Sequence, residues 1–189
     1  MNYDFKLDSS LQKILSSYRD SFARKTYERP VAYVDLLMDL FGIDDHRKSE
    51  NSQYWGRELG KCWEKLVVVL FRLSAVDFTP SIKEGRSELA DFCSGSDAID
   101  TKYRIGSGDA GTLKKFASNA EKLTALGYRP VLLILRTDNL AAAISKCRSG
   151  GWDIRVGEET FVYIHQNTGF DLQRWMQRVS LDNSFKLDL

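Results

Sequence analysis

The chain lacks any long hydrophobic run. In its 189 residues the longest unbroken apolar stretches are 66–71 and 131–135, and a bilayer-spanning helix needs roughly 20 such residues. Residues 1–4 also lack the basic-then-apolar pattern of a secretory signal peptide. We therefore expect no membrane association and a location in the cytoplasm of a bacterial or archaeal cell.

Cysteine and histidine are scarce. The three cysteines, Cys62, Cys93 and Cys147, are an odd number without clustered spacing, which argues against a disulfide framework and against a zinc site. The two histidines, His46 and His165, are far apart in the sequence and do not indicate a histidine-based hydrolytic centre. Any chemistry must come from other side chains.

The chain also lacks an excess of charge of either sign. Its 27 basic and 26 acidic residues give a net charge of +1, whereas a protein that binds nucleic acid without sequence preference is usually more basic. A sequence-specific binder can place its positive charge on one face, so charge balance does not exclude it. The length and the 43% hydrophobic content suit one globular domain with a sizeable core.

Hydrophobic periodicity predicts a helical N-terminal portion over residues 1–50. Apolar residues at helical spacing indicate a helix over 10–23. A second helix is predicted to start at Pro30 and to stop at Gly42. The polar stretch 43–53 is predicted to be a loop.

The remaining pattern alternates between helical and extended segments from residue 54 onward. We predict a helix over 54–73, a loop containing Pro80 and Gly85, and a strand hairpin of 87–93 and 98–105. A helix from 112, strands over 131–135, 152–156 and 160–164, and helices over 139–148 and 170–178 complete the prediction. The fold class is α/β: a mixed central β-sheet flanked by helices, in one domain (1–189) whose core spans 54–165.

Three charged side chains fall together on the predicted hairpin. Side chains alternate across a strand, so Asp100 and Lys102 project from the same face. Asp91 lies on the preceding strand, where a hairpin can bring it next to Asp100. Two neighbouring carboxylates raise each other's pKa unless a cation joins them. Mg²⁺, which prefers oxygen ligands, would resolve that conflict and could bind a scissile phosphate.

The segments 88–91 and 98–102 (Glu-Leu-Ala-Asp and Ala-Ile-Asp-Thr-Lys) resemble the D-x(n)-[D/E]-x-K core of the PD-(D/E)XK nucleases. That superfamily includes most type II restriction endonucleases. Asp91 matches its first acid, Asp100 its second acid and Lys102 its lysine. The chain departs at one position, because Ala90 stands where the motif has proline.

The resemblance implies a restriction-endonuclease-like fold and a Mg²⁺-dependent endonuclease that hydrolyses double-stranded DNA as a homodimer, without a nucleotide cofactor. Asp91 and Asp100 would hold the metal ion, and Lys102 would orient or deprotonate the attacking water. Members of the superfamily often carry a glutamate on the helix before the hairpin. Glu64 and Glu58 are both candidates here, and we favour Glu64, which sits further along the helix.

Residues 106–111 match the pattern G-x-G-x-x-G after a strand and before a helix. A dinucleotide site is disfavoured, because the preceding strand is charged on one face and no acidic residue closes a second strand about twenty residues later. We predict instead that this loop contacts a DNA backbone phosphate. Its contact residues would be Arg104, Ser107, Lys114 and Lys115. A plain connection between strand and helix is the alternative.

Two other functions are compatible with these residues. One is a structure-selective nuclease of repair or recombination within the same superfamily, which would act only on branched or mismatched DNA. The other is a non-catalytic DNA-binding or partner-binding module with a decayed site. Apart from both, Asp100 and Lys102 could form only a surface pair worth tenths of a kcal/mol.

Overall fold

The computed structural model of the chain describes residues 34–85, 87–106, 108–181 and 185–187, all within one compact unit, Val34–Leu189. Its centre is a five-stranded sheet in which the strands lie side by side in the order of the sequence. The strands are β1 (Phe78–Glu84), β2 (Ser87–Ser94), β3 (Asp97–Lys102), β4 (Arg129–Ile134) and β5 (Asp153–Val156). β1, β2 and β3 pair antiparallel, whereas β3, β4 and β5 pair parallel. The predicted mixed α/β sheet is therefore confirmed.

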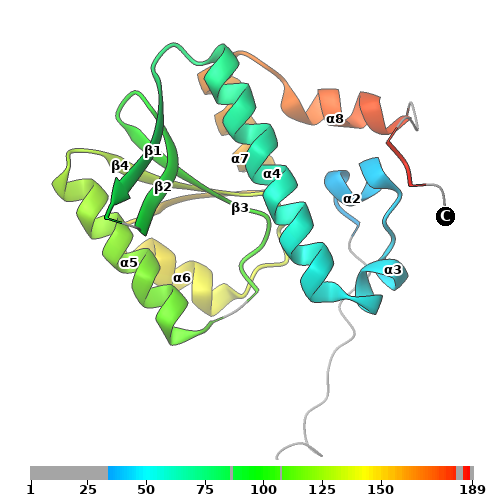
Figure 1. Cartoon of the computed structure of the whole chain (residues 1–189), viewed down its shortest axis with the longest axis horizontal. Helices are drawn as coiled ribbons and strands as arrows, with labels where there is room; N and C mark the ends of the chain where they lie inside the picture. The colour runs from blue at the N-terminus through cyan, green and yellow to red at the C-terminus, as the bar shows by residue number, and fades with distance from the viewer. Residues whose placement is uncertain (1–33, 86, 107, 182–184, 188–189) are drawn as a thin grey trace, which may run out of the picture. The chain divides into compact units, whose positions relative to one another are not determined.

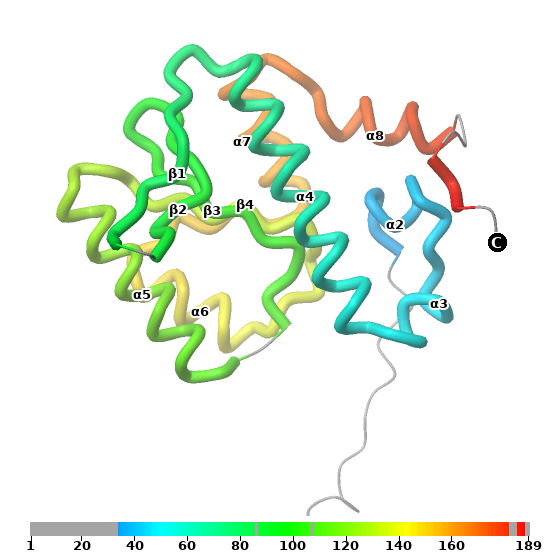
Figure 2. The backbone as a smooth tube through the Cα atoms, viewed as in Figure 1, coloured from blue at the N-terminus to red at the C-terminus, as the bar shows by residue number. Residues whose placement is uncertain are grey.

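Helices cover both faces of the sheet (Figures 1 and 2). α4 (Ser52–Ser74) and α7 (Glu158–Thr168) cover one face, and α5 (Ala110–Ala125) and α6 (Ala141–Ser149) cover the other. α2 (Leu36–Phe41), α3 (Asp45–Glu50) and α8 (Leu172–Leu181) complete the described helices. None of the helices in the described ranges is both long and apolar enough to cross a membrane.

The alternation of side chains along β3 divides the core into two clusters. Ile99 packs with Trp63 of α4 on one face, and Ala98 packs with Phe116 of α5 on the other. All of these side chains are at most 8% exposed. Asp100 and Lys102 share the parity of Ala98, so the strand directs them toward the face that α5 covers.

The long helix α4 follows the predicted segment 54–73 closely. Its buried residues are Leu59, Trp63, Val67 and Phe71, while Leu66 and Leu70 are partly buried. Glu64 lies at the side of this buried stripe and is exposed.

Two predictions for the N-terminal half were wrong. Residues 43–53 contain α3 and the start of α4, because Asp44 accepts a hydrogen bond from the Arg47 amide at 2.7 Å and Asn51 accepts one from the Tyr54 amide at 3.0 Å. Such caps stabilise helices that bury little. The second helix begins after an extended Asp35, not at Pro30, and it stops at Gly42 as predicted. The helix predicted over 10–23 lies outside the described residues.

Two further errors concern strands. The predicted loop around Pro80 is β1, an edge strand, where a proline removes no hydrogen bond from the sheet interior. The predicted strand over 160–164 belongs to α7, which begins at Glu158. Within its first turn, the Thr160 hydroxyl is shared between the carbonyls of Ile134 and Arg155, which anchors the helix to β4 and β5. The run Thr-Phe-Val-Tyr-Ile has high β-propensity, and these tertiary contacts override it.

A buried acid joins the start of β3 to β4 and α7. Asp97 is 5% exposed; it pairs with Arg129 through two guanidinium nitrogens at 2.8 and 2.5 Å, and it accepts the Tyr163 hydroxyl at 2.5 Å. Tyr163 is buried, so its hydroxyl depends on this acceptor. The cluster holds the hairpin end of β3, at the opposite end of the strand from Lys102.

We predict that Asp97→Ala lowers the free energy of unfolding by about 2–3 kcal/mol, because it leaves the Tyr163 hydroxyl buried without an acceptor. Asp153→Ala is the matched control, since it removes a nearby acid whose ion pair is with the partly exposed Arg155 and which accepts no bond from Tyr163 among the described contacts; it should cost at most about 1 kcal/mol. Denaturant unfolding measures both. Equal losses for the two variants would contradict this assignment.

Candidate functional site

The hairpin strands separate where the candidate acids lie. The β2–β3 ladder comprises Phe92↔Ile99, Cys93↔Ala98 and Ser94↔Asp97, whereas the β3–β4 ladder runs the full length of β3. On the other side of Phe92 from this ladder, the Asp91 carboxylate accepts hydrogen bonds from β3 in place of the β2 backbone. Its Oδ2 accepts hydrogen bonds from the Thr101 amide and the Thr101 hydroxyl, both at 2.7 Å. The side chain of Asp91 is thereby fixed beside β3.

Asp100 and Lys102 form a close ion pair on β3. The Lys102 ammonium donates to Asp100 Oδ1 and to the Thr101 carbonyl, the latter at 3.0 Å. The side chain of Asp100 is 11% exposed and that of Lys102 is 36% exposed. The same ammonium lies 5.8 Å from the centre of the Phe116 ring on α5. This is a partly buried pair beneath a helix, which distinguishes it from a solvated cross-strand pair.

The pKa values of this pair are set by burial and by neighbouring acids. Burial raises the pKa of Asp100 to about 6, Asp91 adds to the rise, and Lys102 opposes it. The pKa of Lys102 is raised, because its acidic neighbours, led by Asp100 and Asp91, outweigh the effect of burial. A carboxyl that titrates near neutrality is a feature of functional sites. Asp91, Asp100, Lys102 and Glu64 all act on one another here.

Glu64 joins this group from α4, and Glu58 does not. Burial and then Asp91 raise the pKa of Glu64, with Lys102 acting in the opposite direction. Glu58 instead pairs with Arg57 at 3.0 Å and with Lys61 at 3.1 Å, and these bonds lower its pKa. Of the two glutamates on this helix, the structure therefore brings Glu64 into the electrostatic neighbourhood of the hairpin acids.

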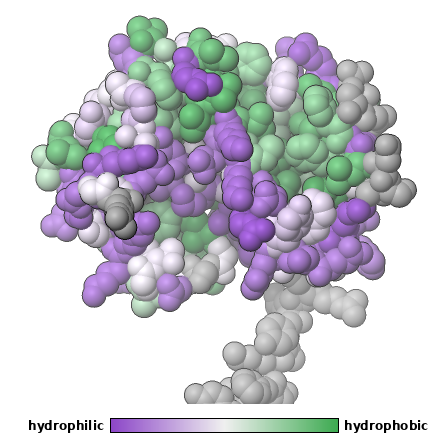
Figure 3. Space-filling model, viewed as in Figure 1, coloured by the Kyte–Doolittle hydropathy of each residue, from purple (hydrophilic) through white to green (hydrophobic). Residues whose placement is uncertain are grey.

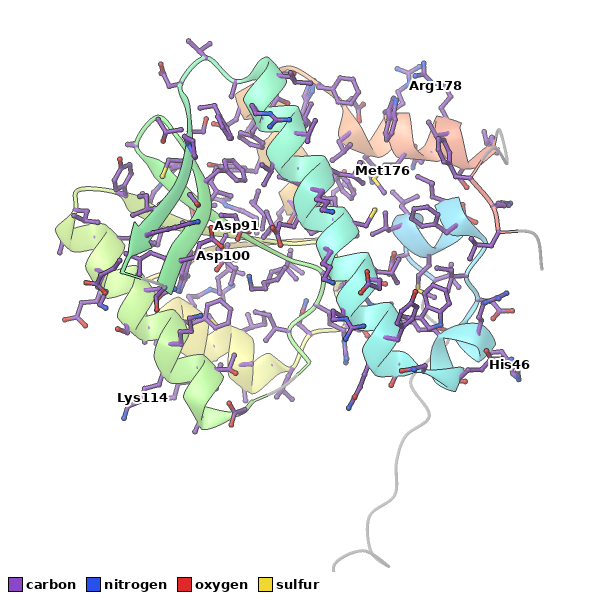
Figure 4. All side chains as sticks on the ribbon, viewed as in Figure 1. His46, Asp91, Asp100, Lys114, Met176 and Arg178 are labelled. Carbon is purple, nitrogen blue, oxygen red and sulfur yellow. The ribbon has the colours of Figure 1, made fainter. Side chains whose placement is uncertain are left out.

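A glycine brings α4 close to the strand that carries the pair. A Cβ placed on Gly60 would lie 3.8 Å from the Cβ of Tyr103, the residue that follows Lys102. Glu64 comes one helical turn after Gly60 on the same side of the helix. The close approach at Gly60 therefore brings this part of α4 near the end of β3, where Asp91 and Lys102 act on the charge of Glu64. Asp91 and Asp100 themselves lie near each other (Figure 4).

Tyr103 is itself held by a buried polar network. Its hydroxyl donates to Asp35 Oδ2 at 2.5 Å and accepts from Arg136 Nη1 at 3.3 Å. Arg136 is 4% exposed; it also contacts Asp35 at 3.0 Å and binds both oxygens of Asp138 at 2.7 and 2.9 Å. Asp35 in turn caps α2. This network fixes the end of β3 immediately after Lys102.

At the glycine loop after β3, an acidic side chain lies where we predicted a phosphate contact. Asp109 caps α5 by accepting the Thr112 amide at 2.9 Å, and this bond lowers the pKa of Asp109. A carboxylate therefore already lies at the helix N-terminus where the phosphate contact was predicted. Arg104 pairs with Asp138 at 3.0 Å.

The other predicted phosphate contacts are not brought to the acid pair. Lys114 and Lys115 are exposed on α5, and Lys114 points away from Asp91 and Asp100 (Figure 4). Ser107 lies outside the described residues. A DNA contact of this loop stays a prediction.

The oxygen atoms at the site suit a hard divalent cation. Asp91, Asp100 and the Thr101 carbonyl offer oxygen ligands, and Lys102 already places a positive charge on Asp100 and on that carbonyl. In the described part of the chain, no three side chains of His, Cys, Asp or Glu are grouped to hold a metal ion by themselves. This is compatible with Mg²⁺, which is often bound by one or two carboxylates and completes its shell with water.

Sequence analysis missed two residues at this site. Thr101, the residue between Asp100 and Lys102, holds Asp91 through its amide and hydroxyl. No sequence signal predicts this, because it depends on where β2 and β3 stop pairing. Glu88 is the second, since its charge raises the pKa of Glu64. Its place on the strand that carries Asp91 could have indicated it.

Comparison with known proteins adds no family to this description. The chain matches no protein-family model, no curated protein and no solved structure. Functional conclusions therefore depend on the geometry of the site.

We predict that the Asp100 carboxyl titrates near pH 6 in metal-free protein, measured by carboxyl-resolved NMR. Its folded pKa lies above the ordinary value of 3.8, so the folded state binds the proton more tightly. The resulting stability is present below pH 4 and is lost as the pH rises through 6. Lys102→Met should raise this pKa further, and Asp91→Asn should lower it. A titration near pH 4 would contradict the described environment of Asp100.

Proposed function

We propose that the chain is a Mg²⁺-dependent endonuclease of the PD-(D/E)XK type with a restriction-endonuclease-like fold, which hydrolyses phosphodiester bonds in double-stranded DNA. The particular activity that we propose is that of a type II site-specific restriction endonuclease. One observation carries the proposal: Asp91 is held at Thr101, the neighbour of Asp100, close enough to act on the Asp100 charge, and Lys102 lies against Asp100 in a partly buried position.

The environment of these residues supports catalysis over a purely structural role. A partly buried ion pair beside further acids is costly to fold around, and hydrophobic residues in its place are often equally or more stable. Here burial raises the pKa of Asp100 to about 6, while Asp91 and Glu64 crowd it with like charge. Such an arrangement is explained if a divalent cation completes it.

The roles of the residues follow from their chemistry. Asp91 and Asp100 would hold Mg²⁺, which when bound polarises a phosphate and stabilises developing negative charge. The Lys102 ammonium would donate a hydrogen bond to the attacking water or to the phosphate, where extra negative charge develops. Glu64, with its raised pKa, would hold a water molecule and accept a proton. Water attacks phosphorus, the bond to the 3′ oxygen breaks, and the ends carry 5′-phosphate and 3′-hydroxyl groups.

A homodimer is part of the proposal. One site in each chain cuts one strand, and a two-fold dimer matches a palindromic sequence. A structure-selective repair or recombination nuclease would use the same residues, so the substrate distinguishes it. Discrete fragments from linear duplex support the restriction activity, whereas cutting limited to branched or mismatched DNA supports the alternative.

We predict that the purified chain cuts plasmid or phage DNA with Mg²⁺ and does not cut it with EDTA. Asp91→Ala, Asp100→Ala and Lys102→Ala should each lower the single-turnover rate at least about 10³-fold, because each removes a group that acts on the reacting phosphate. Gel-resolved cleavage time courses measure this. Circular dichroism melts check that the variants fold.

Arg178→Ala serves as the control, because Arg178 lies on α8 and points away from the acid pair (Figure 4). It should cut like the parent chain. Normal digestion by folded Asp91→Ala or Asp100→Ala protein would overturn the assignment. Absence of any Mg²⁺-dependent cutting across duplex, branched and mismatched substrates would overturn the proposed function.

Glu64 and Glu58, both on α4, give a matched test of which residues belong to the site. We predict that Glu64→Gln lowers the cleavage rate about 10- to 100-fold, because it removes a proton acceptor next to Asp91. Glu58→Gln should stay within about twofold of the parent, since in the described part of the chain Glu58 forms its ion pairs with Arg57 and Lys61. Single-turnover rates decide between them, and equal effects would exclude Glu64 from the site.

A further inference from the structure

Lys48 on α3 has an unusual environment. Its ammonium donates to the Tyr103 hydroxyl at 3.2 Å and to the sulfur of the buried Met38 at 3.4 Å, and it lies 5.1 Å from the centre of the Tyr103 ring. All of these partners are uncharged. Among the described residues, no carboxylate lies within ion-pair distance of Lys48, although three acids act on it from further away.

A second cation shares the partners of Lys48. Arg136 Nη1 also contacts the Tyr103 hydroxyl, at 3.3 Å, and the Met38 sulfur, at 3.4 Å. Two cationic groups with two acceptors in common lie only a few ångströms apart. Arg136 is paired with Asp35 and with both oxygens of Asp138. Burial and the charge of Arg136 lower the pKa of Lys48. The positive charge of Lys48 is thus poorly compensated within the described part of the chain.

Open space lies on the neighbouring helix. Gly60 of α4 faces Tyr103, and Gly56 precedes it by one turn on the same side of the helix. Among the described residues, a Cβ at Gly56 would meet no atom within 4 Å, so packing in this part of the chain does not require glycine there. A glycine within a helix is destabilising relative to alanine. It is typical of places where another molecule approaches the backbone closely.

Exposed charged residues form a band along α4: Arg57, Lys61, Glu64 and Lys65. Figure 3 shows hydrophilic surface along this helix. Glu64 is the member of this band that lies near Asp91. A nucleic-acid strand bound along α4 would therefore pass both the acid pair and the end of the helix near Gly56.

We propose that Lys48 binds a backbone phosphate of nucleic acid, distinct from the phosphate that is cut, and that this contact compensates its charge beside Arg136. The proposal rests on the proposed function, because the bound polynucleotide is the substrate of the Asp91, Asp100 and Lys102 site. Tyr103 links the two places, since it follows Lys102 in the chain and holds Lys48 through its hydroxyl.

The test compares Lys48→Met, Lys48→Arg and the parent chain in binding to a fluorescent DNA duplex, with EDTA present to prevent cutting. Lys48→Met should weaken binding about 3- to 10-fold and should lower the slope of log K against log salt by about 0.9, the value for one phosphate contact. Lys48→Arg should bind like the parent. Lys146→Met, which removes an exposed lysine from α6, should change neither quantity beyond the general effect of one charge.

Stability separates a ligand contact from a structural one. Because Lys48 lies beside Arg136 without an ion-pair partner among the described residues, Lys48→Met should leave the melting temperature unchanged or raise it. A fall in melting temperature together with unchanged affinity and salt slope would overturn the inference. Inorganic phosphate that binds at Lys48 without competing with duplex would also overturn it. If the parent chain binds no duplex at all, the proposed function itself is contradicted.

Discussion

The ion pair between Asp100 and Lys102 is the constraint on which the site depends. A carboxylate under α5 can stay charged only where a cation compensates it, and its pKa of about 6 shows that Lys102 alone does so incompletely. The pair exists because both residues lie on the same face of β3, and because Asp91 replaces the β2 backbone at Thr101. The separation of β2 from β3 thus shapes the candidate site, since it leaves room for acids where backbone hydrogen bonds between the strands would otherwise form.

The surroundings of this pair are built to hold β3 at both ends. At the hairpin end, Asp97 joins β3 to Arg129 and Tyr163. At the other end, the hydroxyl of Tyr103 binds Asp35, and the network continues to Arg136. Buried polar networks of this kind are stable only when every member is satisfied. They give β3 a fixed position, so that the side chains of Asp100 and Lys102 meet their partners in a defined geometry.

Sequence patterns predicted the parts of the fold that local periodicity and alternation determine. The sheet class, the long helix α4 and the continuous apolar strand β4 followed from spacing alone, as did the shared face of Asp100 and Lys102. Errors arose where contacts distant in sequence decide the structure. The segment 160–164 is helical because Thr160 binds carbonyls of β4 and β5, and β1 tolerates Pro80 because it lies at an edge.

The candidate site was predicted in its main acids and lysine, and the structure brings those residues together. Of the two predicted glutamates, Glu64 is the one whose charge is affected by Asp91 and Lys102, and its role at the site stays a prediction. The roles of Thr101 and Tyr103 could not be predicted, because they depend on strand separation and on partners about 70 residues away, such as Asp35. The glycine loop is the opposite case. Its sequence matches a phosphate-binding pattern, but the helix N-terminus that would bind the phosphate is already capped by Asp109.

The central claim is that Asp91 and Asp100 share one divalent cation. The most direct measurement is an NMR titration of the chain with Mn²⁺, which broadens the signals of nuclei close to where it binds. The account predicts that the carboxyl signals of Asp91 and Asp100 broaden first and together, and that excess Mg²⁺ restores them. Broadening that begins at other acids and spares this pair, or that Mg²⁺ does not reverse, would contradict it.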